Sequence, residues 1–143
     1  MPDRFIHQDG RIHAVAVACE DAAGRWLLIR RSRHVRAPLK VAFPGGTLEE
    51  GETQAEAVVR EMREELGVEV EPLQAFWSVD FPNRPLTLWA WHARLLSWDL
   101  QPCPDEVAEV LWLTPGEATA HPDRTDQMDD YIAALQQHVI GPR

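Results

Sequence analysis

Cysteine is scarce in this chain, and long hydrophobic runs are absent. The two cysteines, Cys19 and Cys103, lie far apart without a CxxC pattern, so neither a zinc site nor a disulfide framework is expected. The most apolar early stretch, residues 14–19, is far shorter than the roughly 18–20 apolar residues of a membrane span. No apolar segment follows the first four residues, which argues against a secretory signal. These absences predict an intracellular, cytoplasmic protein without a membrane anchor.

Basic residues are in the minority, because 14 lysines and arginines stand against 23 acidic residues, for a net charge of −9. Such a chain lacks the broad positive surface that binds extended nucleic acid. The charges are segregated: residues 25–40 hold six basic residues and no acid, whereas residues 46–68 hold seven glutamates and two arginines. This order suits an anionic ligand held partly by arginine and partly through metal ions. Two solvated faces of opposite sign are the alternative.

The length of 143 residues suits one domain, and no linker rich in glycine, serine or proline divides the chain. Alternating β-branched and small residues predict a strand over 12–19, which we expect to form a hairpin with a strand at 26–29. Further strands are expected at 41–43, 73–81, 86–98 and up to Leu113, and helices at about 54–66, after Thr114, and over 128–139, the last one ended by Gly141 and Pro142. This order predicts an α/β or α+β sandwich with a mixed β-sheet, forming a single domain over residues 1–143.

The clearest helix carries signals at both ends and an apolar stripe between them. Thr53 and Glu56 form a capping box at its start, and Gly67 is placed to end it. The stripe recurs at three- and four-residue spacing and consists of Ala55, Val58, Val59, Met62 and Leu66.

Three glutamates of the same helix, Glu61, Glu64 and Glu65, share another face. Carboxylates at this spacing repel one another by roughly 0.2–0.5 kcal/mol per pair. The repulsion disappears if hard divalent cations lie between them, and oxygen-only ligands suit Mg²⁺ or Mn²⁺. An acidic face exposed to solvent is the alternative.

A longer motif surrounds these glutamates. Five residues separate Gly46 from Glu52, seven more separate Glu52 from Arg60, and the chain then reads REMREELGV over 60–68. This pattern resembles the signature of the Nudix hydrolase family, Gly-x5-Glu-x7-Arg-Glu-U-x-Glu-Glu-x-Gly-U with U aliphatic, at every fixed position. The preceding Phe-Pro-Gly at 43–45 is similar to the family's usual lead-in. So many fixed positions in register are far more specific than a short motif.

The resemblance, carried by residues 46–68, implies a Nudix-type α/β/α sandwich and a divalent metal site that grips a pyrophosphate. It implies that Arg60 pairs with Glu52 to orient the helix, for which an ordinary surface ion pair is the alternative. It also implies that Gly45 and Gly46 let backbone approach the metal and the phosphates. The residues implied at the metal are Glu61, Glu64, Glu65 and Gly45.

The family's reaction is hydrolysis of a nucleoside diphosphate linked to another group, by attack of water on phosphorus. Metal ions neutralise phosphate charge and lower the pKa of a bound water molecule, and a nearby carboxylate accepts the second proton of that water. Glu61 is the candidate within the motif for this carboxylate. Glu106 and Glu109 are the candidates on a later loop, and Glu109 is the preferred one of these two.

Three arginines, Arg31, Arg33 and Arg36, lie in the segment after the second predicted strand, which would face the motif. A guanidinium matches two phosphate oxygens at once, so we expect these arginines to bind substrate. Aromatic residues could complete the site if the strand residues Trp77, Trp89 and Trp91 line a base-binding cleft. Large aromatics are more often core, which is also the expectation for Trp26 and Trp112.

Together these features predict a Mg²⁺-dependent (or Mn²⁺-dependent) Nudix pyrophosphohydrolase with a nucleotide-type small molecule as substrate. A nucleoside triphosphate or an oxidised guanine nucleotide is the first candidate substrate. A dinucleotide, a nucleotide sugar or coenzyme A is the alternative within the family, and a non-catalytic nucleotide-binding module is the alternative outside enzymes. Membranes and extended nucleic acid are not expected partners. A homodimer is possible, because the sequence does not determine the oligomeric state.

Overall fold

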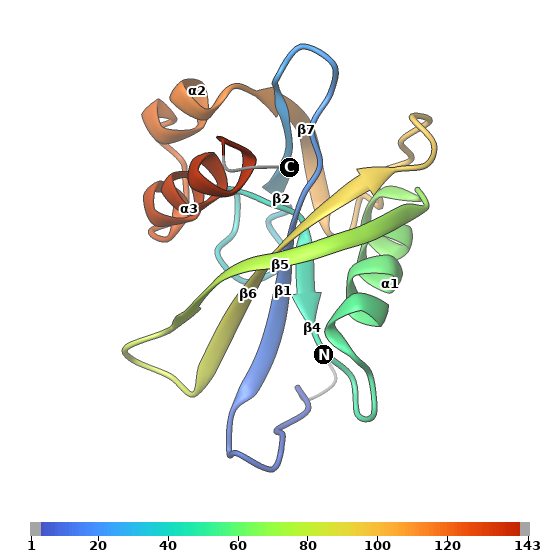
Figure 1. The fold of residues 1–143 in the computed structure, drawn as a ribbon. Coiled ribbons are helices and arrows are strands. Elements are labelled where there is room, and N and C mark those ends of the chain that lie inside the picture. The colour runs from blue at the N-terminus through green and yellow to red at the C-terminus, as the bar shows by residue number, and fades with distance from the viewer. Residues whose placement is uncertain (1–3, 141–143) are drawn as a thin grey trace.

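The structure is a computed structural model that describes residues 4–140, in which two β-sheets are combined with three α-helices (Figure 1). The larger sheet has the strand order β4-β1-β6-β5, and the smaller sheet has the order β3-β2-β7. β1 runs parallel to β6 while the other paired strands are antiparallel, which confirms the predicted mixed sheet. The elements are β1 (Ile12–Ala18), β2 (Trp26–Arg31), β3 (Val41–Ala42), β4 (Gly45–Thr47), α1 (Gln54–Leu66), β5 (Val70–Asp80), β6 (Leu86–Leu95), β7 (Val107–Leu113), α2 (Pro115–Ala120) and α3 (Met128–Ile140).

The helices lie on opposite sides of the strands. In Figure 1, α1 stands on one side, and α2 and α3 lie together on the other. α1 packs against β1, β4 and β5, whereas α3 packs against β5 and α2. This arrangement is the predicted sandwich, and each helix buries one side against strands.

β1 is covered on both of its faces. Val15 and Val17 pack into one core cluster, whereas Ala16 and Ala18 pack into a second one. The expected hairpin between this strand and β2 is wrong, because β2 lies in the smaller sheet. The edges of β1 are taken by β4 and β6, so the chain leaves the larger sheet after a single bridge at the turn, between Glu20 and Trp26.

α1 begins and ends where the sequence predicts. Both bonds of the capping box form: the Glu56 N–H donates to the Thr53 hydroxyl oxygen at 3.1 Å, and the Thr53 N–H donates to the Glu56 carboxylate at 2.9 Å. Gly67 caps the other end with φ 65°, a left-handed conformation that favours glycine. The side facing the strands is fully buried at Val58, Met62 and Leu66. One edge of a rigid helix is thereby fixed next to β4.

Five of the six tryptophans contribute to the core, whereas Trp98 is 57% exposed. Trp26 is buried, Trp89, Trp91 and Trp112 pack against the first core cluster, and Trp77 packs against the second. The indole N–H groups of Trp89 and Trp91 donate to His13 and to Gln54. The predicted core role of these tryptophans is therefore confirmed.

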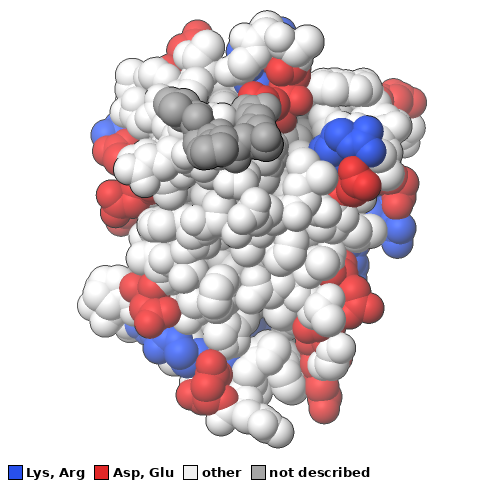
Figure 2. All heavy atoms as spheres, viewed as in Figure 1, with Lys and Arg blue, Asp and Glu red and all other residues white. Residues whose placement is uncertain are grey.

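Figure 2 shows one face of the molecule, on which basic side chains lie beside acidic ones near the edge. Among the described residues, no helix is long and apolar enough to cross a membrane. The expected stop of the last helix at Gly141 and Pro142 lies outside the described residues.

Candidate functional site

Three carboxylates converge at the edge of α1. Glu61 and Glu65 come from this helix, and Glu106 comes from the residue directly before β7. One oxygen of each side chain lies within 4.8 Å of the others. Glu61 and Glu65 are only 8% and 4% exposed. Residues up to 45 positions apart in the sequence thus form one group, the acidic cluster of Glu61, Glu65 and Glu106.

The electrostatics of the acidic cluster favour a bound cation. Burial raises the pKa of Glu61 to about 7, against the opposing effect of Arg60. Burial, and next the charge of Glu61, raise the pKa of Glu65 well above its usual value. Burial also raises the pKa of Glu106. Carboxylates held this closely ionise readily only when positive charge is added between them.

The backbone before α1 is built closely around two of these carboxylates. The Gly45 N–H donates to Glu65 Oε1 at 2.7 Å. A Cβ atom at Gly46 would lie 2.4 Å from Glu61 Oε1, so a side chain at this position would displace the carboxylate. The donor set is oxygen only and its orientation is fixed, which fits a hard divalent cation.

Arg60 connects the acidic cluster to the loop before the helix. Its Nε lies 2.6 Å from Glu52 Oε2, and its Nη1 donates to Glu61 Oε1 at 2.9 Å. Its Nη2 also donates to the Thr47 carbonyl, so the guanidinium ties the loop, strand β4 and the cluster together. The pairing with Glu52 is present in the structure, and Glu52 is itself largely buried, with a side chain 11% exposed.

Glu64 stands at the rim of this arrangement. Its side chain is half exposed and lies 3.2 Å from Arg60 Nη1. Its charge contributes to the raised pKa values of Glu61 and Glu106.

Of the two loop glutamates, the structure brings Glu106 and not Glu109 to the cluster, which corrects the sequence-based preference. Glu109 Oε1 lies 3.1 Å from Arg30 Nε and its side chain is 55% exposed. The cause is the register of β7, in which a bulge places Glu109 opposite Arg30 and Val107 opposite Arg31. Glu106, one residue before the strand, therefore points to the site.

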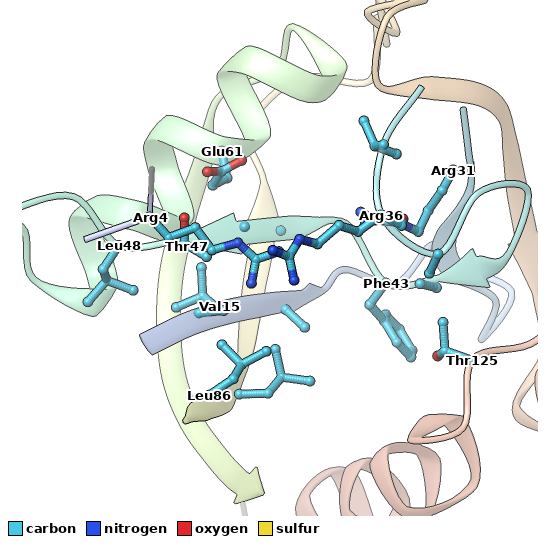
Figure 3. A pocket seen from close by; sticks show the side chains of 18 of the residues that line it. Arg4, Val15, Arg31, Arg36, Phe43, Thr47, Leu48, Glu61, Leu86 and Thr125 are labelled. Atoms are coloured by element: carbon cyan, nitrogen blue, oxygen red, sulfur yellow. The ribbon is translucent and has the colours of Figure 1, made fainter. Parts of the chain in front are cut away.

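The acidic cluster forms one part of a cavity of about 840 Å³ (Figure 3). The floor is made by β1 and β4, with Val15 and Thr47 among its residues. Thr125, Gln127 and Met128 line the cavity near α3. An apolar part is lined by Phe81, Leu86 and Leu88. The tryptophans do not belong to this lining.

Besides Arg60, four arginines line the cavity, of which the sequence predicted two. Arg31 and Arg36 line it, but Arg33 does not and is exposed, so the expected contribution of Arg33 is not supported. Arg4 and Arg84 line the cavity as well. Sequence reasoning missed both, because Arg4 precedes the first strand and Arg84 lies in a distant turn, and no motif marks either one.

Comparison with known proteins identifies the family. Residues 10–135 match the NUDIX domain family. The chain is 35% identical over 89 residues to the 8-oxo-dGTP diphosphatase of Escherichia coli K12, covering 61% of this chain and 67% of that protein. It is 34% identical over 121 residues to the CTP pyrophosphohydrolase of the same organism, covering 82% of this chain and 77% of that protein.

A solved structure supports the fold. The crystal structure of the MutT protein from Methanosarcina mazei Go1 is 22% identical and superposes with a TM-score of 0.79, covering 92% of this chain and 96% of that one. The family match over most of the length and the relatives that share it lead to one conclusion: the chain belongs to the Nudix hydrolases, enzymes that cleave phosphoric anhydrides.

Proposed function

We propose that this chain hydrolyses a nucleoside triphosphate at a phosphoric anhydride bond, with Mg²⁺ or Mn²⁺ as the required ion. The observation that carries the proposal is the convergence of Glu61, Glu65 and Glu106 in a cavity that continues past arginines to an apolar surface. Carboxylates that can hold a metal, arginines that can bind phosphate and apolar side chains that can contact a base thus line the same cavity. The two relatives are named for 8-oxo-dGTP and for CTP, which are both nucleoside triphosphates.

The acidic cluster is the proposed metal site, with Glu64 as a further carboxylate at its rim. A divalent ion there would neutralise phosphate charge and lower the pKa of bound water. Gly45 and Arg60 fix the orientations of Glu65 and Glu61 through the bonds described above. Fixed ligands of this kind reduce the reorganisation needed during the reaction.

Glu106 is the proposed acceptor of the proton from the attacking water. Among the described residues, its carboxylate has no hydrogen-bond donor, whereas Glu61 is bonded to Arg60 and Glu65 to Gly45. A carboxylate without a donor keeps its lone pairs free for a proton. Glu61, the candidate within the motif, already accepts a hydrogen bond from Arg60, whereas Glu106 can ligate an ion through one oxygen and accept the proton on the other.

The nucleoside is assigned to the apolar part of the cavity. Leu86, Leu88 and Phe81 offer apolar contacts to a base, and Gln127 and Thr125 offer hydrogen-bonding groups in the lining of the same cavity. Ligand sites commonly combine a largely apolar wall with a few polar groups in this way.

A substrate panel tests the proposed function. The full chain would be assayed with Mg²⁺ or Mn²⁺ against nucleoside triphosphates, 8-oxo-dGTP, dinucleotides, nucleotide sugars and coenzyme A. We expect hydrolysis of at least one triphosphate, which EDTA abolishes and Glu65→Gln lowers at least 100-fold in kcat. The matched control is Glu71→Gln. Glu71 is an exposed glutamate of β5 that forms an ion pair with Arg94 of β6. Hydrolysis of a nucleotide sugar but no triphosphate would contradict the proposed substrate, and no hydrolysis at all would favour a binding module.

A further inference from the structure

The twelve arginines among residues 4–140 fall into two groups. Seven form ion pairs with carboxylates: Arg11, Arg25, Arg30, Arg60, Arg63, Arg94 and Arg124. Five have no such partner within residues 4–140: Arg4, Arg31, Arg33, Arg36 and Arg84. All of the second group except Arg33 line the cavity. Because acidic residues outnumber basic ones in this chain, unpaired arginines gathered in one cavity indicate an anion supplied by a ligand.

Two of these arginines face each other. In Figure 3, Arg4 and Arg36 enter the cavity from opposite sides, and their guanidinium groups lie next to each other between Glu61 and Leu86. They come from separate segments, one before β1 and one in the loop between β2 and β3. Burial, and next the charges of Arg36, Arg84 and Arg31, lower the pKa of Arg4. Like charges in this position repel each other until an anion lies between them.

The loop that carries Arg36 has an unusual backbone. Ala37 and Leu39 adopt left-handed conformations, with φ values of 50° and 62°. Leu39 is 50% exposed, so burial of its side chain does not explain this geometry. The loop is instead held by hydrogen bonds, in which Arg31 Nε donates to the Arg36 carbonyl and the Leu39 N–H donates to the Arg31 carbonyl. Unfavourable backbone conformations persist where the surrounding structure fixes them, and here they accompany the placement of Arg36 over the cavity.

We propose that Arg4 and Arg36 form a clamp for one phosphate group of the substrate, separate from the phosphates next to the proposed metal site. The inference rests on the proposed function and refines its substrate class. A guanidinium binds two phosphate oxygens, so two of them match a doubly charged phosphate. A nucleoside triphosphate has a phosphate outside the bond to be cleaved, whereas a nucleotide sugar has none. The clamp therefore selects nucleotides with three or more phosphates.

The clamp is tested without metal and without catalysis. The full chain, freed of metal with EDTA, would be titrated with inorganic tripolyphosphate at low salt in a calorimeter. We expect binding that Arg4→Gln and Arg36→Gln each weaken at least tenfold. The double variant should bind little more weakly than either single variant, because both arginines hold the same phosphate. Arg33→Gln is the matched control, since it lies in the same loop outside the cavity, and its affinity should stay within twofold of the unmodified chain.

Two outcomes would overturn the clamp. One is that the unmodified chain does not bind tripolyphosphate, and the other is that Arg33→Gln weakens binding as much as Arg4→Gln, which would indicate only a general attraction of charge. Thermal unfolding of each variant establishes that it is folded. Because the titration involves no hydrolysis, clamp-dependent binding together with an inactive enzyme would reject the proposed function and leave the clamp intact.

Discussion

The three glutamates of the acidic cluster differ in the hydrogen bonds that fix their positions. Glu61 and Glu65 are buried and bonded to Arg60 and Gly45, whereas Glu106 is held through its backbone, by hydrogen bonds with Ser32 and Cys103. The motif predicted the first two because their spacing on one helix determines which face they share. It could not choose between Glu106 and Glu109, because that choice depends on the β-bulge opposite Arg30 and Arg31. Such a register shift arises from tertiary pairing and has no signature in a single sequence.

Substitution of these two loop glutamates is the sharpest test at this scale. Glu106→Gln removes the proposed proton acceptor at constant size, and general-base catalysis typically contributes about 10²–10⁴-fold. We therefore expect kcat to fall at least 100-fold, with Glu109→Gln within about threefold of the unmodified enzyme. Steady-state kinetics on the best substrate of the panel measures both. Equal activity of the two variants would remove Glu106 from the mechanism.

Among the helices and strands, α1 contributes most to the candidate site, because it carries two of the three carboxylates of the acidic cluster. Its bounds were predictable because local signals define them: a capping box at Thr53 and a left-handed Gly67. The placement of β1 and β2 in separate sheets was not predictable, because strands that are adjacent in sequence usually pair. Here β4 and β6 occupy both edges of β1, while the two core clusters cover its faces.

Removing the cap of α1 should lower stability. Thr53→Ala deletes the side-chain oxygen that accepts the Glu56 N–H, and such losses cost about 1 kcal/mol. Urea unfolding should show this decrease, while Thr53→Ser, which keeps the hydroxyl oxygen, should stay within about 0.5 kcal/mol of the unmodified chain. Equal losses in both variants would show that the methyl group, and not the cap, stabilises this end.

The whole molecule should show the effect of the acidic cluster in its dependence on pH. The pKa of Glu61 is raised to about 7 in the folded chain, so Glu61 binds a proton there at pH values where the unfolded chain has released it. The metal-free free energy of unfolding should therefore fall as pH rises from about 4.5 to 7. Acidic groups with lowered pKa values, such as Glu52, change the free energy of unfolding below this pH range.

Thermal unfolding between pH 4.5 and 8 measures this dependence. Glu61→Gln should flatten it, and Mg²⁺ or Mn²⁺ should raise the unfolding temperature of the unmodified chain most above pH 7. Identical pH profiles for the unmodified chain and Glu61→Gln would mean that Glu61 ionises normally in the folded protein.

The cavity is a property of the whole molecule that the sequence disclosed only in part. The basic segment predicted Arg31 and Arg36, but Arg4 and Arg84 reach the cavity only because β1 and β6 lie side by side. Contacts between segments this far apart in sequence follow from topology, which spacing within one segment does not encode.

The central claim is that Glu61, Glu65 and Glu106 hold a divalent ion, and Mn²⁺ binding followed by electron paramagnetic resonance tests it most directly. Titration of the folded chain, with and without a non-hydrolysable nucleoside triphosphate, should show saturable Mn²⁺ binding that Glu65→Gln weakens at least tenfold and Glu71→Gln does not. If Mn²⁺ remains free in solution with and without the nucleotide, or binds equally to both variants, the acidic cluster is not a metal site.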